Sequence, residues 1–208
     1  MGMKIARFMV GMIGTNCYLA WDDETKEAAI FDPAANIPQI AQTIAEESLT
    51  LKYVILTHGH GDHIGGVEAV LKANPDAQLV AGEGERQILA DARLNFSRDI
   101  VGKDLVLSPD IWVKDGDVLK LGKQELKIIA TPGHTPGGIS ILAGEALFSG
   151  DTLFHASIGR TDLALGCYED LINSIRDKLY VLPDDTLVLP GHMEETTIEF
   201  EKKHNPFV

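Results

Sequence analysis

One apolar run near the middle of the chain is followed at once by a cluster of side chains that can bind metal. The run Tyr53–Leu56 has the composition of a buried strand, and the segment Thr57–His63 after it reads THGHGDH. This segment contains three histidines and one aspartate, and its two glycines allow the backbone to curl around a point. The chain must therefore fold so that the end of a buried strand lies beside a cation site.

The pattern of an apolar run, a glycine and a potential ligand recurs three times downstream. His134 follows the run 126–130 in the sequence TPGH, Asp151 follows 146–149 in GD, and His192 follows 187–189 in PGH. Strands that end at the same edge bring such residues together, and the glycines permit tight turns. We expect seven side chains to converge, namely His58, His60, Asp62, His63, His134, Asp151 and His192.

Seven ligands exceed what one tetrahedral ion uses, so the sequence predicts a binuclear site with two divalent cations. We assign one cation to His58, His60 and His134, and the other to Asp62, His63 and His192. Asp151 has two oxygens that can reach both cations and is assigned as the bridge. Imidazole suits zinc and iron alike and carboxylate tolerates iron or manganese, so zinc is expected first, with Fe or Mn as alternatives.

Runs rich in Val, Ile, Leu and aromatic residues predict strands in both halves of the chain. They span 16–21, 28–31, 52–56, 78–80, 126–130, 139–142, 146–149 and 186–189, and Lys4 and Arg7 interleave with apolar residues as in a first strand. Helical spacing is clearest over 37–45, with Asn36 as candidate N-cap and Pro38 in the first turn, and over 171–179. Shorter helices are predicted over 67–71, around 88–89 and over 198–203.

Four strand-like runs between Val118 and Ser149 are joined by turns that contain glycine and are too short for helical crossovers. Neighbouring strands there must be antiparallel. Helices flank strands in both halves, so we expect an α/β layered sandwich with mixed sheets and not a doubly wound parallel sheet. The weakly periodic segment 93–110 is predicted to be irregular and to form the rim of a binding cleft.

Size and charge narrow the class of protein. A chain of 208 residues should bury roughly 70% of its unfolded surface, so we expect one domain over 1–208 that needs no disulfide between Cys17 and Cys167. The apolar runs fall short of the ~20 residues of a membrane helix, and the first residues lack a signal-peptide pattern, which predicts a cytoplasmic protein that does not contact a membrane. The net charge of −13 disfavours nucleic acid as a partner.

These motifs resemble those of the metallo-β-lactamase fold hydrolases, and among them the glyoxalase II-like (hydroxyacylglutathione hydrolase-like) group. The resemblance rests on THGHGDH, on TPGHT (131–135), GDTLF (150–154) and PGH (190–192), and on the closing TTI with Glu201 and NPF, and it covers nearly the whole chain. It implies a four-layer αββα sandwich with the metals at one edge of the two sheets. The chain is similar to the short members, without the helical C-terminal domain that supplies most glutathione contacts.

Two cations that share a water lower its pKa and leave hydroxide as a nucleophile at neutral pH. The cations would also stabilise the tetrahedral anion formed at a carbonyl, and thiolate is a leaving group that needs little protonation. We therefore predict a hydrolase that cleaves a small-molecule thioester, such as S-lactoylglutathione or a related thiol conjugate, with Asp62 and Asp151 as its catalytic carboxylates. Proton shuttling by Asp62 would be secondary to metal binding.

Four residues near the motifs have two interpretations each. Asp32 and Thr57 either orient the ligands through hydrogen bonds or serve as turn and cap residues. Arg160 matches the position of a cation that contacts the thiol carrier's carboxylate in the glyoxalase II-like group, or it forms a surface ion pair with Asp162. His155 is more simply a packing residue than a further ligand.

Two other functions fit the same motifs. A persulfide dioxygenase of this fold resembles the chain at Gly159–Asp162 and uses one iron held by two histidines and one aspartate. A module that binds metal without turnover is the other, although a complete ligand set beside a glycine-opened rim argues against it.

Overall fold

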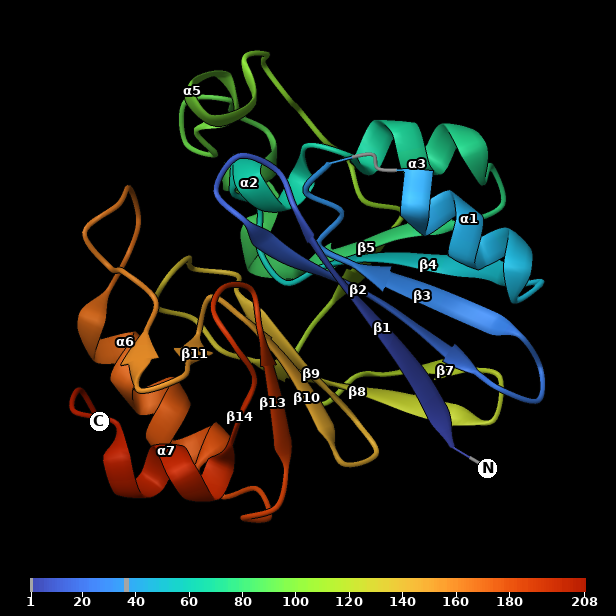
Figure 1. The fold of residues 1–208 in the computed structure, drawn as a ribbon. Helices are drawn as coiled ribbons and strands as arrows, with labels where there is room; N and C mark the ends of the chain where they lie inside the picture. Colours follow the sequence, from blue (N-terminus) through green and yellow to red (C-terminus); the bar gives the residue numbers. More distant parts are fainter. Residues whose placement is uncertain (1, 36–37) are drawn as a thin grey trace.

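Two six-stranded sheets form the centre of the molecule in the computed structural model, which describes residues 2–35 and 38–208 (Figure 1). The first sheet has the order β1 (Met3–Val10), β2 (Thr15–Asp22), β3 (Glu27–Phe31), β4 (Thr50–Leu56), β5 (Gln78–Gly82), β6 (Ile111–Val113). The second has the order β14 (Thr196–Thr197), β13 (Leu187–Pro190), β10 (Ala146–Gly150), β9 (Ile139–Ala143), β8 (Gln124–Ala130), β7 (Val118–Leu121). A short ribbon pairs β11 (Leu153–Phe154) with β12 (Ser157–Ile158).

Both sheets are mixed, as the sequence predicts. In the first, β1, β2 and β3 are antiparallel, whereas β3, β4, β5 and β6 run parallel. In the second, β7 to β10 are antiparallel neighbours, β10 is parallel to β13, and β13 is antiparallel to β14. The short turns of the 118–149 region therefore produce the antiparallel arrangement expected of them.

The two sheets pack face to face through alternate side chains of their strands. In β3, Ala29 and Phe31 point toward the second sheet, and Ala28 and Ile30 point to the other side. Phe31 stacks on Phe148 of β10 with ring centroids 4.0 Å apart. Because both faces of these strands are covered, they consist of nearly continuous apolar residues.

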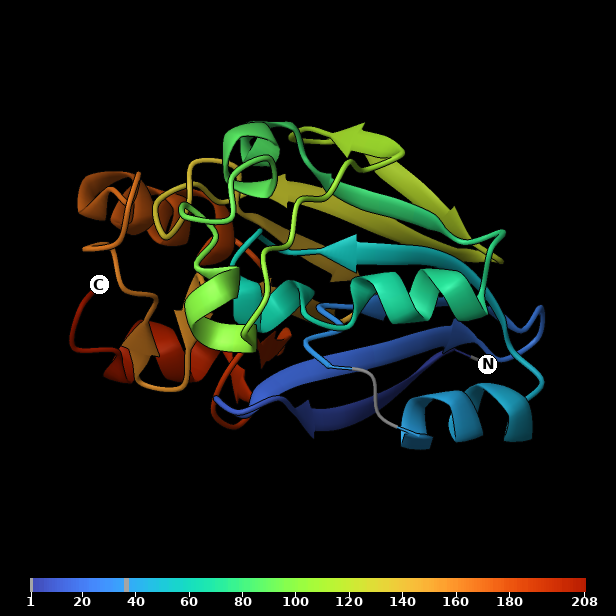
Figure 2. The same ribbon diagram turned by 90° about the horizontal axis from the view of Figure 1, so that it is seen from above.

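Helices cover the outer face of each sheet, which gives the four αββα layers (Figures 1 and 2). On the first sheet lie α1 (Pro38–Glu46), α2 (Gly61–Ile64), α3 (Val67–Ala73) and α5 (Ser97–Val101). The short helices η1 (Glu83–Glu85) and α4 (Arg86–Leu89) follow β5 along the chain. On the second lie α6 (Tyr168–Ser174), its helical continuation η2 (Ile175–Leu179) and α7 (Ile198–His204). Within the described ranges, none of the helices is long and apolar enough to cross a bilayer.

Two expectations from the sequence concern the start of α1 and the segment 93–110. The candidate cap Asn36 and the helical position Ile37 lie outside the described residues. The segment 93–110 is not wholly irregular, because α5 forms within it. Asn95 Oδ1 accepts a hydrogen bond from Ser97 N at 2.9 Å, and Ser97 Oγ accepts one from Leu105 N at 2.9 Å. These contacts of buried polar side chains stabilise a turn of helix that has no apolar periodicity.

Candidate metal centre

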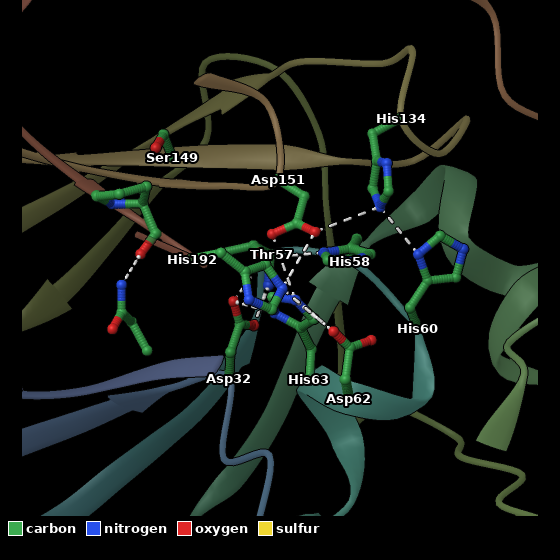
Figure 3. Close-up of polar contacts among 12 residues, drawn as sticks. Asp32, Thr57, His58, His60, Asp62, His63, His134, Ser149, Asp151 and His192 are labelled. Atoms are coloured by element: carbon green, nitrogen blue, oxygen red, sulfur yellow. Dashed lines mark hydrogen bonds and ion pairs between the residues drawn. The ribbon is translucent and has the colours of Figure 1, made fainter. Parts of the chain in front are cut away.

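Seven polar side chains meet where the loops of both sheets come together (Figure 3). His58 and His60 lie in the loop after β4, and Asp62 and His63 lie in the first turn of α2. The second sheet supplies the other three from the loops after β8, β10 and β13, namely His134, Asp151 and His192. The structure thus brings all seven residues of the predicted set into one cluster.

The histidines and carboxylates fall into overlapping groups, in each of which the candidate ligand atoms all lie within 4.8 Å of one another. His58, His60 and His134 form one group, with His60 Nδ1 2.9 Å from His134 Nε2. A second group contains Asp62, His63 and His192, in which Asp62 Oδ2 lies 3.2 Å from His192 Nε2 and 3.6 Å from His63 Nε2. These two groups contain the residues assigned to the two cations from the sequence, and a third group, His58, His63 and Asp151, connects them.

Asp151 lies between the two groups. Its Oδ1 is 3.3 Å from His63 Nε2, and its Oδ2 is 3.5 Å from His192 Nε2 and 3.7 Å from His134 Nε2. The carboxylate therefore contacts both sets of imidazoles, as a residue shared by two cations would.

Unpaired buried atoms show that this donor set fits metal ions. His58 Nε2, His60 Nε2, His63 Nε2 and Asp151 Oδ1 are buried without a hydrogen-bond partner. Native proteins rarely leave buried polar atoms unpaired, because each costs about 1–3 kcal/mol. Imidazole nitrogens and carboxylate oxygens are the donors that zinc, iron and manganese accept, so cations would satisfy these atoms.

Burial and charge set the protonation of the cluster. Burial, assisted by neighbouring imidazoles, holds the pKa of His58 well below its usual range and lowers the pKa of His60 to about 3. Both rings are therefore neutral, which is the metal-binding form. Burial opposes charge on His63 also, but the carboxylates of Asp151, Asp62 and Asp32 outweigh it and raise the pKa of His63.

Asp32 and Thr57 make the contacts that an orienting role requires. Asp32 accepts hydrogen bonds from Thr57 N (2.8 Å) and Thr57 Oγ1 (2.6 Å), and its Oδ2 lies 3.0 Å from His63 Nδ1. Thr57 Oγ1 is also 3.2 Å from Nδ1 of His58. On the other side of the site, His134 Nδ1 lies 2.7 Å from the carbonyl oxygen of Arg160. These partners occupy the outer ring nitrogens and direct the opposite nitrogens into the cluster.

Glu85 is a supporting residue that sequence reasoning missed. Its side chain is fully buried, and it accepts hydrogen bonds from Gly59 N (2.8 Å) and Gly137 N (2.9 Å). Gly59 separates His58 from His60, and Gly137 lies in the loop that carries His134, so one carboxylate ties both loops of the first group. Burial raises its pKa. The sequence signal is weak, because Glu83-Gly84-Glu85 looks like an ordinary polar turn.

A cavity of about 560 Å³ opens over the cluster. Its floor includes His60, Asp62, His134, Asp151 and His192. Phe96, Asp99 and Ile100 line its edge, so part of the segment 93–110 forms a rim as predicted.

Arg160 lies at this cavity, but its guanidinium also pairs with Asp162, from Nε to Oδ1 at 2.7 Å and from Nη2 to Oδ2 at 2.8 Å. Arg160 therefore forms the predicted ion pair with Asp162 and also lines the cavity, so the structure is compatible with both interpretations of this residue. His155 lies outside the cluster, beside Glu194 (2.5 Å) and the ring of Phe200, in agreement with its exclusion from the ligand set.

Comparison with known proteins extends these findings. The sequence model described as Metallo-beta-lactamase superfamily matches residues 10–192. The chain is 40% identical to the probable metallo-hydrolase YqgX of Bacillus subtilis and 40% identical to the hydroxyacylglutathione hydrolase GloC of Haemophilus influenzae, over 99% of this chain and 98% of each relative. It is also similar to the crystal structure of BLEG-1 B3 metallo-beta-lactamase, with a TM-score of 0.90, 38% identity and coverage of 98% of this chain and 99% of that one.

Proposed function

The chain belongs to the metallo-beta-lactamase superfamily, and from this premise we propose that it is a metal-dependent hydrolase with a binuclear site. The observation that carries the proposal is the position of Asp151 between two ligand groups that contain unpaired buried atoms. In the proposal, His58, His60 and His134 would hold one cation, Asp62, His63 and His192 would hold the other, and Asp151 would be shared between them. Zinc is the expected metal, with iron or manganese as alternatives.

Divalent cations bound there would polarise a substrate carbonyl and lower the pKa of a water molecule. The protein's own contribution is to hold and orient the ligands. Asp32 directs His63, the carbonyl of Arg160 directs His134, and Glu85 ties together the two loops of the first group. The carboxylate of Asp62 lies at the cavity floor, where it is also placed to accept a proton.

A thioester is the substrate class that suits this cavity. Among the described residues that line it, the titratable side chains outside the seven-residue cluster are Asp99 and Arg160. Arg160 is held by Asp162 and keeps its proton, so the cavity favours a leaving group that needs little protonation beyond the proton that Asp62 can transfer. Thiolate is such a group, and the similarity to a hydroxyacylglutathione hydrolase supports S-lactoylglutathione or a related thiol conjugate as a first substrate to test.

The test is hydrolysis by protein of measured metal content. We expect two metal ions per chain by elemental analysis and release of free thiol from S-lactoylglutathione or another thioester of a panel that also includes a β-lactam. Replacement of Asp151 by Asn should abolish turnover and lower the metal content. Two filled sites combined with inactivity toward every thioester would contradict the proposed function.

A mononuclear iron dioxygenase acting on a persulfide is the second candidate. Two groups of the cluster consist of two histidines and one carboxylate, which is a ligand set that iron oxygenases use, namely His58, His63 and Asp151, and Asp62, His63 and His192. A single iron in either group would leave the other four candidate ligands without a metal, which favours the hydrolase. One iron per chain together with oxygen uptake on glutathione persulfide would identify this activity instead.

A further inference from the structure

The walls of the cavity above the metal cluster are largely apolar. They are formed by Ile13 in the β1–β2 turn, Phe96 and Ile100 at α5, Phe154 and Ile158 in the β11–β12 ribbon, and Leu163 in the loop that follows. Ile13 is 55% exposed, so part of this wall is open to solvent. Met193, in the loop after β13, also lines the cavity, so segments far apart in the chain place apolar side chains around the position where a substrate reaches the proposed cations.

The charged side chains of the cavity provide little attraction for an anionic group. Outside the cluster, the charged residues that line its described part are Arg160 and Asp99. Arg160 is 61% exposed and forms a two-pronged ion pair with Asp162, so a substrate carboxylate must compete for it with a carboxylate already in place. Asp99 adds negative charge at the rim, and the whole chain carries a net charge of −13.

We propose that the preferred substrates are thioesters whose non-reacting part is uncharged and apolar. This inference rests on the proposed hydrolase function and specifies its substrate class. In the reaction the carbonyl carbon gains a bond to the oxygen of water and loses its bond to sulfur. The sulfur leaves with that electron pair and receives a proton derived from the water, so no oxidant or reductant is needed.

The kinetic test compares three lactoyl thioesters with the same acyl group. The thiols are benzyl mercaptan, which is neutral and apolar, N-acetylcysteamine, which is neutral and small, and glutathione, which is anionic. Burial of the phenyl ring should give the benzyl thioester a kcat/KM about tenfold above each of the others. A kcat/KM that is equal for all three, or highest for the glutathione thioester, would overturn the proposal.

Variants of the wall identify the source of the preference. Ile100→Ala and Leu163→Ala should each reduce the ratio of kcat/KM for the benzyl thioester to that for the N-acetylcysteamine thioester about threefold or more. Val181→Ala removes a similar apolar side chain that is 70% exposed and does not line the cavity, and it should leave the ratio unchanged. If activity on the glutathione thioester dominates and is lost in Arg160→Gln, Arg160 anchors a carboxylate and the proposal is wrong.

A binding measurement separates this inference from the proposed function. Calorimetry on the metal-loaded protein would compare 2-(benzylthio)ethanol with S-methylglutathione, neither of which can be hydrolysed as a thioester. We expect tighter binding of the benzyl compound and weaker binding after Leu163→Ala. Selective binding of the benzyl compound without thioester hydrolysis would refute the hydrolase function and support the apolar site. Hydrolysis without a preference for apolar compounds in either assay would support the hydrolase function and refute the apolar site.

Discussion

The imidazole of His63 lies between three carboxylates, one beside its Nδ1 and two beside its Nε2. Asp32 Oδ2 lies 3.0 Å from Nδ1, while Asp62 and Asp151 lie 3.6 and 3.3 Å from Nε2. An outer partner of this kind sets the tautomer and orientation of a metal-binding histidine. At this scale we expect the metal affinity of the second ligand group to depend on Asp32, although Asp32 is not one of the proposed ligands.

Replacing Asp32 by Asn should weaken metal binding without removing a ligand. The amide retains the size of the side chain but loses an acceptor for Thr57 or His63, and the affinity for one of two zinc ions should fall about 10- to 100-fold. Competition titration with a chromophoric chelator measures this directly. Asp184→Asn, which removes an exposed carboxylate paired with Lys202, is the control, and equal affinities in the two variants would disprove the role of Asp32.

Replacing Glu85 by Gln should destabilise the metal-free protein. The substitution replaces one of the two carboxylate oxygens by an NH2 group, which cannot accept the hydrogen bond from Gly59 N or Gly137 N. The backbone donor is then buried without a partner, which should lower the free energy of unfolding by about 1–3 kcal/mol. Urea unfolding in the presence of chelator gives the change in free energy. Glu83→Gln alters an exposed carboxylate of the same turn, so a Glu85 variant as stable as this control would contradict the prediction.

At the scale of elements, the end of β2 is joined to the turn between β7 and β8 of the other sheet. Asp22 Oδ2 accepts hydrogen bonds from Lys123 N (2.9 Å) and Gln124 Nε2 (3.1 Å), while Oδ1 accepts from Glu24 N and Thr25 N at 2.9 Å each. These donors, the Thr25 amide foremost, hold the pKa of Asp22 below its usual range. One carboxylate therefore caps its own turn and links the two sheets.

The lowered pKa of Asp22 predicts a stability that depends on pH. The folded state favours the ionised carboxylate, so its contribution is present above the pKa of about 4 in the unfolded chain and is lost as the pH falls through the folded pKa. Asp22→Asn should be less stable than the parent protein at pH 7, and the difference should shrink below about pH 4. Urea unfolding with chelator at several pH values tests this, with the exposed Asp76→Asn as control, and a difference independent of pH would contradict it.

At the scale of the whole molecule, the proposed cations would connect the two halves of the sandwich. The loops of the first sheet provide His58, His60, Asp62 and His63, and those of the second provide His134, Asp151 and His192. The apolar layer between the sheets is continuous, with Phe31, Tyr18 and Phe148 in mutual contact, which supports the proposal that residues 1–208 form one domain. Metal binding should therefore stabilise the whole fold and not one loop alone.

Removal of metal should lower the free energy of unfolding of the entire protein. A ligand present at 1,000 times its Kd stabilises the folded state by about 4 kcal/mol, so chelation should cost a similar amount under those conditions. Thermal or urea unfolding with and without chelator measures it. His155→Ala, outside the cluster, should respond to chelation like the parent protein, whereas His192→Ala should respond less. A parent protein whose stability is unaffected by chelation would refute the stabilisation.

The sequence by itself determined the candidate ligands, most of the strands and the layered arrangement. His134, Asp151 and His192 each follow an apolar run and a glycine, and the other four candidate ligands lie in the segment 57–63 directly after the run 53–56. The short turns of 118–149 permit only antiparallel neighbours, so these features follow from residues close together in the chain. The structure contains both predicted ligand groups together with a third, His58, His63 and Asp151, that connects them, so the assignment of ligands to two cations stays a prediction.

Only the tertiary structure decided how these parts support one another. Glu85 contacts backbone amides 26 and 52 residues away, and Asp22 binds a turn 101 residues away. The apolar cavity likewise joins segments that are far apart in the sequence. Patterns along a chain indicate the local conformation of a residue and whether its side chain is buried. These contacts, in contrast, form only when the two sheets pack and bring distant loops within hydrogen-bonding distance.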